Sequence, residues 1–250
     1  MKKSSLFLTI LAVLFILSLF ASDLVLRKKY NTIDKSDPFW NYTKLNRGNF
    51  HHIKMTGGNI TRTSFVPGAN GSVGILSEWE WGMRDRVNSS ISNDTLFVQV
   101  LEKNVPPNTR DWMKYHVLIA ISCPDLLTVN GVNTNLSLYK MKQKNFSVTL
   151  AGRSEMEIET DVSDFDSLFI SEKDTSRLKI EMSEDINNYG ILHAKAVYAR
   201  VYGNSLLDVG HFQIESLHQE ISDSAAIILS GSGLKQIRLN PGPQNTTSKK

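Results

Sequence analysis

The sequence has almost no cysteine: Cys123 is the only one in 250 residues. A disulfide within the chain is therefore impossible, and so is a metal site built on paired cysteines. Cys123 lies two residues after the end of the apolar run 116–121, in a position that suits the end of a buried strand. We interpret it as a small buried hydrophobe rather than a catalytic thiol.

An excess of charge of one sign is also nearly absent. The 28 Lys and Arg against 25 Asp and Glu give a formal net charge of +3, and several of the basic residues sit at the two ends of the chain. No basic face is left for nucleic acid, so a nucleic-acid partner is not expected. With 41% hydrophobic and 21% charged residues, the chain has an ordinary globular composition and can bury a sizeable core.

Motifs that identify enzymes are missing as well. The sequence contains no His-Glu-x-x-His, Gly-x-Ser-x-Gly, P-loop or Cys-x-x-Cys pattern, which excludes the zinc proteases, hydrolases and nucleotide enzymes that such motifs reveal. His51 and His52 are adjacent and would point to opposite faces of a strand, so they make a poor metal pair. We therefore predict no catalytic residue and no cofactor, and we favour a protein that is not an enzyme.

The clearest positive signal is at the N-terminus. Lys2 and Lys3 precede an apolar stretch, 6–20, and small residues follow it, which is the layout of an export signal. The stretch can also continue to Leu26, giving roughly 20 residues, the length of a membrane-spanning helix. Residues 1–26 are thus predicted to be a signal peptide or a transmembrane anchor, with membrane contact through residues 6–26. The protein is expected at the cell envelope, either anchored in a membrane or exported to the periplasm or cell surface.

Composition divides the rest of the chain into four parts. Residues 27–47 are polar and aromatic by turns, and Asp37-Pro38 bars a helix, so they are predicted to be a linker. Short β-branched and aromatic runs, broken by Gly, Asn, Asp and Ser, then indicate strands. We expect a β-rich N-terminal part at 48–114 and a more repetitive part at 115–239. The polar segment 240–250 has little to bury and is expected to be disordered.

The second half repeats a strand, a small polar turn that ends in serine, and another strand. The turns end at four serines: Ser154, Ser176, Ser205 and Ser224. Their spacing suits one coil of a solenoid, in which Met156, Leu178 and Leu206 would point inward on successive coils. The sequence therefore predicts an all-β fold, a right-handed parallel β-helix after an N-terminal hydrophobic helix. A β-sandwich built from hairpins is the alternative.

These turns carry a family resemblance. Short alternating strands with Ser- and Gly-containing turns resemble the auto-transporter adhesin family with a head GIN domain, found in envelope proteins of Gram-negative bacteria. The run Leu127-Thr128-Val129-Asn130-Gly131-Val132-Asn133 is similar to the strand and Gly-x-Asn element near the start of that domain. The resemblance covers about residues 115–235. It implies a parallel β-helix at the cell envelope and carries over no catalytic residue.

One acidic cluster could in principle bind a metal. Asp161, Asp164 and Asp166 offer the oxygen ligands that a hard cation such as Ca²⁺ accepts. The central Gly and the final Glu of a calcium loop are absent, so we prefer a solvated turn and predict no metal site.

Glu and Trp alternate over residues 78–81. A strand here would place two carboxylates on one face and two indoles on the other. Paired carboxylates suit a glycosidase and indoles suit a sugar platform, although an edge strand with inward tryptophans is the simpler interpretation. The candidate binding residues are those of an exposed aromatic groove: Trp79, Trp81 and Trp112.

Three functions stay open. The first, which we favour because no catalytic constellation is visible, is an adhesin-like binding or scaffolding module for a polysaccharide or another envelope protein. The second is a polysaccharide-active β-helix enzyme, which requires acids to converge on one face. Its candidates are Asp161, Asp164, Asp166 and Glu181. The third is a membrane-anchored sensor partner, which is disfavoured because only about five residues precede the hydrophobic run.

Overall fold

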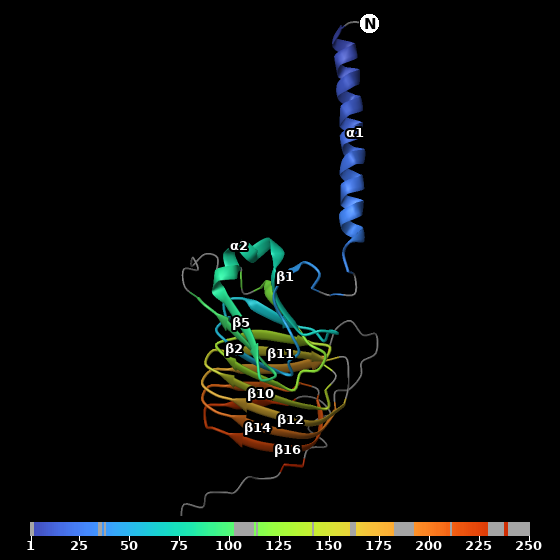
Figure 1. The fold of residues 1–250 in the computed structure, drawn as a ribbon. Coiled ribbons are helices and arrows are strands. Elements are labelled where there is room, and N and C mark those ends of the chain that lie inside the picture. The colour runs from blue at the N-terminus through green and yellow to red at the C-terminus, as the bar shows by residue number, and fades with distance from the viewer. Residues whose placement is uncertain are drawn as a thin grey trace, which may run out of the picture. The chain divides into compact units, whose positions relative to one another are not determined.

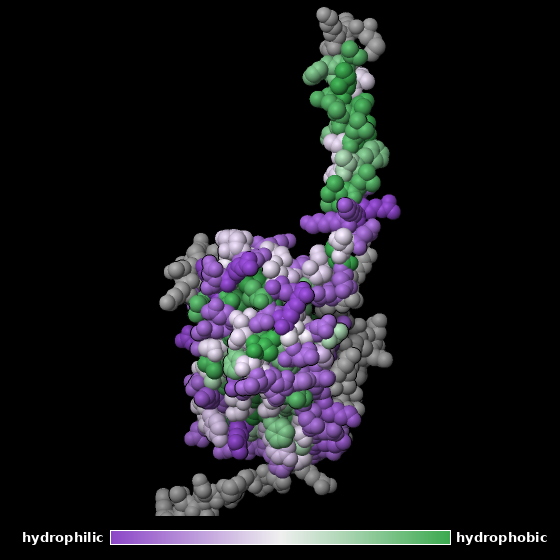
Figure 2. Space-filling model, viewed as in Figure 1, coloured by the Kyte–Doolittle hydropathy of each residue, from purple (hydrophilic) through white to green (hydrophobic). Residues whose placement is uncertain are grey.

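The N-terminal helix stands as a unit of its own. The computed structural model describes residues 3–34, 37, 39–102, 113, 115–141, 143–160, 164–182, 193–210, 212–229 and 238–239. Its helix α1 (Lys3–Asn31) belongs to one compact unit, Met1–Trp40, and the strands belong to a second, Asn41–Lys250. Figure 2 shows α1 coloured as hydrophobic along most of its length, with hydrophilic residues at its C-terminal end, where Lys28 and Lys29 lie.

Length and composition make α1 a candidate membrane span. Within the described residues, Leu6–Asn31 is the one helix that is long and apolar enough to cross a bilayer. At about 1.5 Å per residue, its 26 residues exceed the roughly 30 Å of a hydrocarbon core. An N-terminal signal sequence has the same properties. The chain therefore carries an apolar helix that suits a signal peptide or a membrane anchor.

The body is mostly β and is built from two nine-stranded sheets. The order in the first sheet is β1 (Tyr42–Arg47), β4 (Ser72–Leu76), β7 (Val117–Ser122), β3 (Arg62–Phe65), β9 (Asn135–Tyr139), β11 (Glu155–Thr160), β13 (Arg177–Met182), β15 (Leu206–Asp208) and β17 (Ala226–Ile228). The order in the second sheet is β18 (Arg238–Leu239), β16 (Gln213–Ile221), β14 (His193–Val201), β12 (Asp164–Glu172), β10 (Asn145–Ala151), β8 (Thr128–Val132), β2 (His52–Thr56), β6 (Thr95–Val100) and β5 (Val87–Ser92).

From β8 onward, consecutive strands alternate between the two sheets and pair in parallel with the strand two places further along the chain. Figure 1 shows β10, β12, β14 and β16 following one another along the body. Inward-facing apolar side chains of both sheets form one buried core. Met156 pairs with Leu178 as predicted, but Leu178 pairs next with Leu207, so the predicted inward role of Leu206 is wrong by one residue.

Tight corners lead the chain from the second sheet to the first. Four of these corners contain one residue with left-handed backbone: Asn133 (φ 55°), Gly152 (φ 68°), Asp174 (φ 71°) and Gly203 (φ 68°). Asn and Asp tolerate this conformation, and their side chains bond neighbouring corners. Asp174 Oδ2 accepts a hydrogen bond from the Gly152 N–H at 2.9 Å, and Asn133 Oδ1 accepts one from the Arg153 N–H at 2.9 Å.

Three of the four predicted serine turns lie at the same place in these corners, directly before the aligned strands of the first sheet. The fourth prediction is wrong by one residue, because Ala225 and not Ser224 precedes Ala226. Ser154, Ser176 and Ser205 are buried, and the Ser176 and Ser205 hydroxyls lie 3.2 Å apart. Ser154 Oγ donates to the Ala151 carbonyl at 2.6 Å and accepts from the Thr134 N–H at 3.2 Å. A buried hydroxyl satisfies backbone groups that a sharp turn leaves without a sheet partner, which explains why serine recurs at this position.

The predicted right-handed parallel β-helix is wrong for the body as a whole, because both sheets are mixed. Strand β4 pairs antiparallel with β1 and with β7, and β5 pairs antiparallel with β6. The β5–β6 hairpin follows from the two-residue turn Asn93-Asp94, in which both residues have positive φ (46° and 61°), the geometry of a type I′ turn. A sandwich built from hairpins does not describe the body either, since the strands from β8 onward pair in parallel.

Candidate functional site

The outer face of the first sheet carries a shallow depression of about 610 Å³. Strand alternation sends every second residue of β9, β11 and β13 outward, and the parallel register aligns Ser137, Glu157 and Lys179 in one row. Side chains of both charges line the depression, among them Arg62, Glu155, Glu157, Arg177, Lys179 and Asp208. The alternation of β11 and the register of the sheet therefore bring opposite charges together on this face.

Arg62 lies at the centre of the polar contacts in the depression. Its Nε donates to Ser137 Oγ at 2.7 Å, and its Nη2 donates to Glu157 Oε2. One guanidinium from β3 thus bridges β9 and β11. Because Arg presents several donors in a fixed plane, it can hold two acceptors at once.

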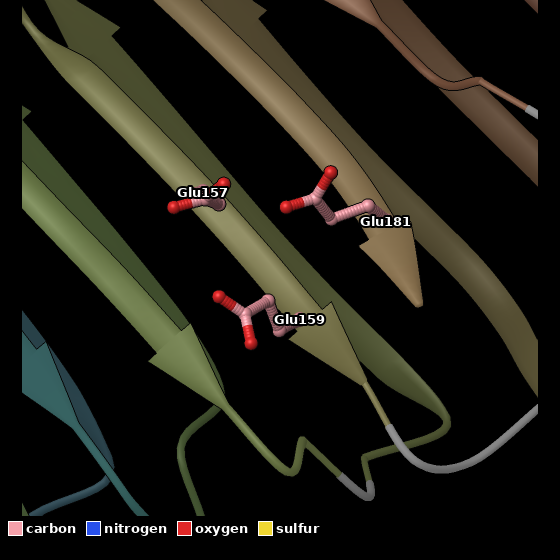
Figure 3. Close-up of side chains that lie close together, drawn as sticks. All are labelled: Glu157, Glu159 and Glu181. Atoms are coloured by element: carbon pink, nitrogen blue, oxygen red, sulfur yellow. The ribbon is translucent and has the colours of Figure 1, made fainter. Parts of the chain in front are cut away.

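Three carboxylates meet beside this arginine. Glu157 and Glu159 come from β11 and Glu181 from β13, as Figure 3 shows. One oxygen from each lies within 4.8 Å of the others. Lys179 forms an ion pair with Glu181, in addition to the pair of Arg62 with Glu157. Arg62 and Lys179 thus each neutralise part of the charge of this cluster.

The two central glutamates share a proton. Burial raises the pKa of Glu157 to about 7, and a hydrogen bond with Glu181 adds to the rise, while Arg62 opposes it. Burial alone would also raise the pKa of Glu181, but its hydrogen bonds with Glu157 and Lys179 outweigh burial and the pKa is lowered. Near neutral pH, Glu157 is therefore partly protonated and donates to an ionised Glu181.

The geometry of Glu157 and Glu181 differs from that of a glycosidase pair. Carboxyl pairs in glycosidases stand roughly 5–9 Å apart so that the sugar carbon or a water fits between them. Glu157 and Glu181 instead hydrogen-bond each other, which leaves no such gap. A charged or polar ligand could instead compete for the groups that Arg62 and Lys179 now hold.

The predicted aromatic groove is only partly described. Residues 77–86 form short helical turns, η1 (Ser77–Trp79), α2 (Glu80–Met83) and η2 (Arg84–Arg86), so the predicted edge strand at 78–81 is wrong. The Trp79 and Trp81 rings stack with their centroids 5.8 Å apart, and Trp81 is 81% exposed. Trp112 lies outside the described residues. The structure thus brings two of the three tryptophans together.

The carboxylate pair suggested at 78–81 is not formed, because the segment is helical. Glu80 Oε1 accepts from Arg84 Nη1 at 2.7 Å, and its Oε2 accepts from Thr43 Oγ1 at 2.8 Å. Both oxygens of Glu80 therefore accept hydrogen bonds from Arg84 and Thr43, and neither bonds a second carboxylate as in a catalytic pair.

The aspartate cluster is only partly described as well. Asp161 and the side chain of Asp164 lie outside the described residues. Asp166 Oδ1 accepts from Lys195 Nζ at 2.6 Å, and this bond lowers the pKa of the exposed carboxyl. Asp166 therefore takes part in a surface ion pair. Of the acids proposed for an enzyme, Glu181 is the one that joins a described carboxylate cluster.

Sequence reasoning overlooked Arg62, Glu157, Glu159 and Lys179. A signal was available, because Glu155-Met156-Glu157-Ile158-Glu159 alternates acids with apolar residues and so puts three acids on one face. The repeat aligns this strand with Arg177-Leu178-Lys179-Ile180-Glu181. Arg62 could not be found in this way, since it lies 95 residues before Glu157.

Comparisons with known proteins give a loose structural likeness. The chain matches no family model and no curated protein. A crystal structure of a proposed lipid-binding protein from Parabacteroides distasonis gives a TM-score of 0.38 at 12% identity, covering 76% of this chain and 94% of that chain. A proposed adhesin from Bacteroides fragilis gives 0.36 at 10% identity, covering 76% and 96%. Another from Parabacteroides merdae gives 0.33 at 9% identity, covering 76% and 95%. Likenesses at this level carry no argument about the function of this chain, and none supports a head GIN domain specifically.

Proposed function

We propose that this protein is an envelope-associated binding module, which holds a polar, charge-bearing ligand in the depression on the outer face of the first sheet. The observation that carries the proposal is the meeting of Arg62, Glu157 and Lys179 in a surface depression of about 610 Å³. A depression with a few convergent polar groups and a carboxyl of raised pKa has the usual features of a binding site.

The charges of the depression define the ligand class. Arg62, Arg177 and Lys179 supply positive charge, while Glu155, Glu157 and Asp208 supply negative charge. These groups compensate one another in the unliganded protein, so binding exchanges internal ion pairs for pairs with the ligand. Such an exchange rewards a ligand with fixed charges and gives little to an apolar one.

The proposed location of the module at the cell envelope rests on α1. A helix of this length and hydropathy would hold the body at a membrane, or would direct it across one and then be removed.

Calorimetric titration of the full chain in detergent micelles tests the ligand class. The probes are three oligosaccharides of matched length: a chitosan hexamer carrying amines, a polygalacturonate hexamer carrying carboxylates, and neutral maltohexaose. We expect one of the charged probes to bind, and we expect Arg62→Ala and Lys179→Met each to weaken its binding at least fivefold. Lys54→Ala, on the outer face of the second sheet, should bind as the parent does.

Two results would contradict the proposal. One is that neither charged probe gives heat of binding, although circular dichroism shows that the protein is folded. The other is a charged probe whose affinity is unchanged in both Arg62→Ala and Lys179→Met, since that ligand would then bind elsewhere.

A further inference from the structure

The outer face of the second sheet differs in chemistry from that of the first. Along one outward row, the parallel register aligns His52, Thr128, Ser147, Phe169, Tyr198 and His218 on successive strands. Three consecutive members carry stacked rings. The Phe169 and Tyr198 centroids are 4.9 Å apart, and those of Tyr198 and His218 are 4.7 Å apart, each pair with an interplanar angle of 6°.

The ring stack ends at Phe169. Its centroid spacings equal the strand spacing of about 4.8 Å, so the ring planes stand across the row and each ring faces the next strand. On one side of Phe169 lies Tyr198. On the other side the row continues with Ser147 and then Thr128, both too small to reach the height of a ring. One face of Phe169, whose side chain is 45% exposed, therefore looks over Ser147.

We call the part of the row that carries Ser147 and Thr128, between the rings of Phe169 and His52, the slot. Three strand spacings, about 14 Å, separate the strand of Phe169 from that of His52, where the next ring of the row stands. His52 leans toward the slot, since its Nδ1 lies 2.8 Å from Thr128 Oγ1. The open space is thus centred over Ser147, between a phenyl face and an imidazole.

Neutral polar side chains surround the slot. Asn145 and Thr149 lie beside Ser147 on β10, and Asn130 lies beside Thr128 on β8, all facing outward in the same sheet. Hydroxyl and amide groups bind a ligand that can donate and accept hydrogen bonds. A purely aromatic occupant would leave them without partners, which is costly on desolvation. A strongly charged occupant would find no counter-charge in these five residues.

We propose that the slot between Phe169 and His52 binds a neutral pyranose ring of a saccharide. One face of the sugar, which carries C–H groups, packs on the electron-rich face of Phe169, and its rim hydroxyls bond the floor and walls at Ser147, Thr149 and Asn130. The sugar continues the ring stack of the row by one or two members. This site is separate from the depression of the first sheet, and either site can fail without the other.

Saturation-transfer difference NMR tests the slot with the full chain in detergent micelles. The probes are maltohexaose, cellohexaose and laminarihexaose, three neutral glucose hexamers that differ in linkage. We expect saturation transfer to ring C–H protons of at least one probe. Ser147→Phe fills the slot with a ring that continues the stack, and Phe169→Ala removes the packing face. Each should weaken binding at least tenfold.

Matched controls separate the slot from general effects. Ser90→Phe introduces the same ring on the same face, four strands away in the order β10-β8-β2-β6-β5, and should bind as the parent does. Arg62→Ala should also leave this binding unchanged. The proposal is overturned if all three sugars give no saturation transfer with the folded protein, or if Ser147→Phe binds as well as the parent. Binding of N-acetyl-tyrosine amide without binding of any sugar would likewise overturn it, because the occupant would then be an aromatic side chain.

Discussion

Glu157 hydrogen-bonds Glu181 diagonally across the parallel strands β11 and β13, although the register pairs Glu157 with Lys179 and Glu159 with Glu181. With this diagonal contact in place, Lys179 forms its ion pair with Glu181, and Glu157 forms its ion pair with Arg62. A single proton therefore connects two ion pairs from three strands. Its loss changes the charge of the depression near neutral pH.

The shared proton makes stability depend on pH. Glu157 has an ordinary pKa of 4.5 and a pKa of about 7 in the folded chain, so the folded state holds the proton more tightly than the unfolded state. The free energy of unfolding should therefore fall as pH rises from about 4.5 to about 7, by about 1–2 kcal/mol after allowance for solvent screening. Glu157→Gln cannot lose this proton. We expect urea denaturation at pH 5, 6, 7 and 8 to show that the free energy of unfolding of Glu157→Gln rises relative to that of the parent as the pH increases to about 7.

Glu155→Gln is the control for this experiment, since it removes an acid from the same strand that is not among the causes of the raised pKa of Glu157. A difference in free energy of unfolding between parent and Glu157→Gln that stays constant from pH 5 to pH 8 would contradict the prediction.

The corner serines should depend on one another. Ser176 Oγ donates to the Lys173 carbonyl at 3.2 Å and lies 3.2 Å from Ser205 Oγ, with both residues buried. Ser176→Val removes one hydroxyl of a buried pair and should lower the free energy of unfolding by about 1–3 kcal/mol. The double variant with Ser205→Val should cost less than the sum of the two single changes, because each single change leaves one hydroxyl without its partner. Additive losses in chemical denaturation would show that the two serines act separately.

The corners also explain how far the sequence predicts the fold. Ser154 and Ser176 were recognisable as turns because small polar residues recur between apolar pairs, and the inward positions of Met156 and Leu178 followed from alternation. The mixed pairing was not recognised. Asn93-Asp94 is a strong local hairpin signal, but the antiparallel contacts of β4 with β1 and β7 join segments distant in sequence, and no local pattern records them.

The candidate sites are also only partly predictable from the sequence. The acids of β11 can be placed on one face from alternation alone, yet their contact with Arg62 depends on the crossing of β3 into the first sheet between β7 and β9. The stack of Phe169 on Tyr198 is invisible in the sequence, because the two residues are 29 positions apart and only the register aligns them. The composition of residues 78–81 marks Trp79 and Trp81 as candidates. The segment is helical, so the alternating faces expected of a strand do not apply to it.

The helix α1 should hold the full chain in a membrane. Counted on to Leu26, its apolar stretch has the roughly 20 residues of a spanning helix, and the prediction rests on that length. We expect a C-terminally tagged chain to stay with the membrane fraction after alkaline carbonate extraction. Leu14→Arg with Leu17→Arg should release it, because each central arginine costs about 2.5–3.5 kcal/mol on insertion. Asn31→Arg, at the end of the helix, is the control and should remain bound. An N-terminal sequence that starts near Ser22 would show instead that the segment is a signal peptide.

Glu172 places a carboxyl in the core without a partner. It is 0% exposed, the register sets it between Leu150 and Val201 in the inward row of the second sheet, and neither carboxyl oxygen has a hydrogen-bond partner among the described residues. Burial raises its pKa from 4.5 to about 8, so it is mostly neutral at pH 7. Since the folded chain favours the protonated form, the contribution of Glu172 to the free energy of unfolding is greatest below about pH 4.5. This contribution declines up to about pH 8, where the carboxyl ionises inside the core.

Glu172→Leu replaces this carboxyl with an apolar side chain of similar size. We expect it to raise the free energy of unfolding by about 1–3 kcal/mol at pH 7 and by more at pH 9, because the parent then carries an unpaired buried charge. Guanidinium denaturation at pH 5, 7 and 9 measures the difference, with Glu220→Gln on the exposed face of β16 as the control for loss of an acid. A gain that does not grow between pH 5 and pH 9 would mean that the Glu172 carboxyl reaches water or a partner in solution, and it would remove the pH dependence argued from its burial.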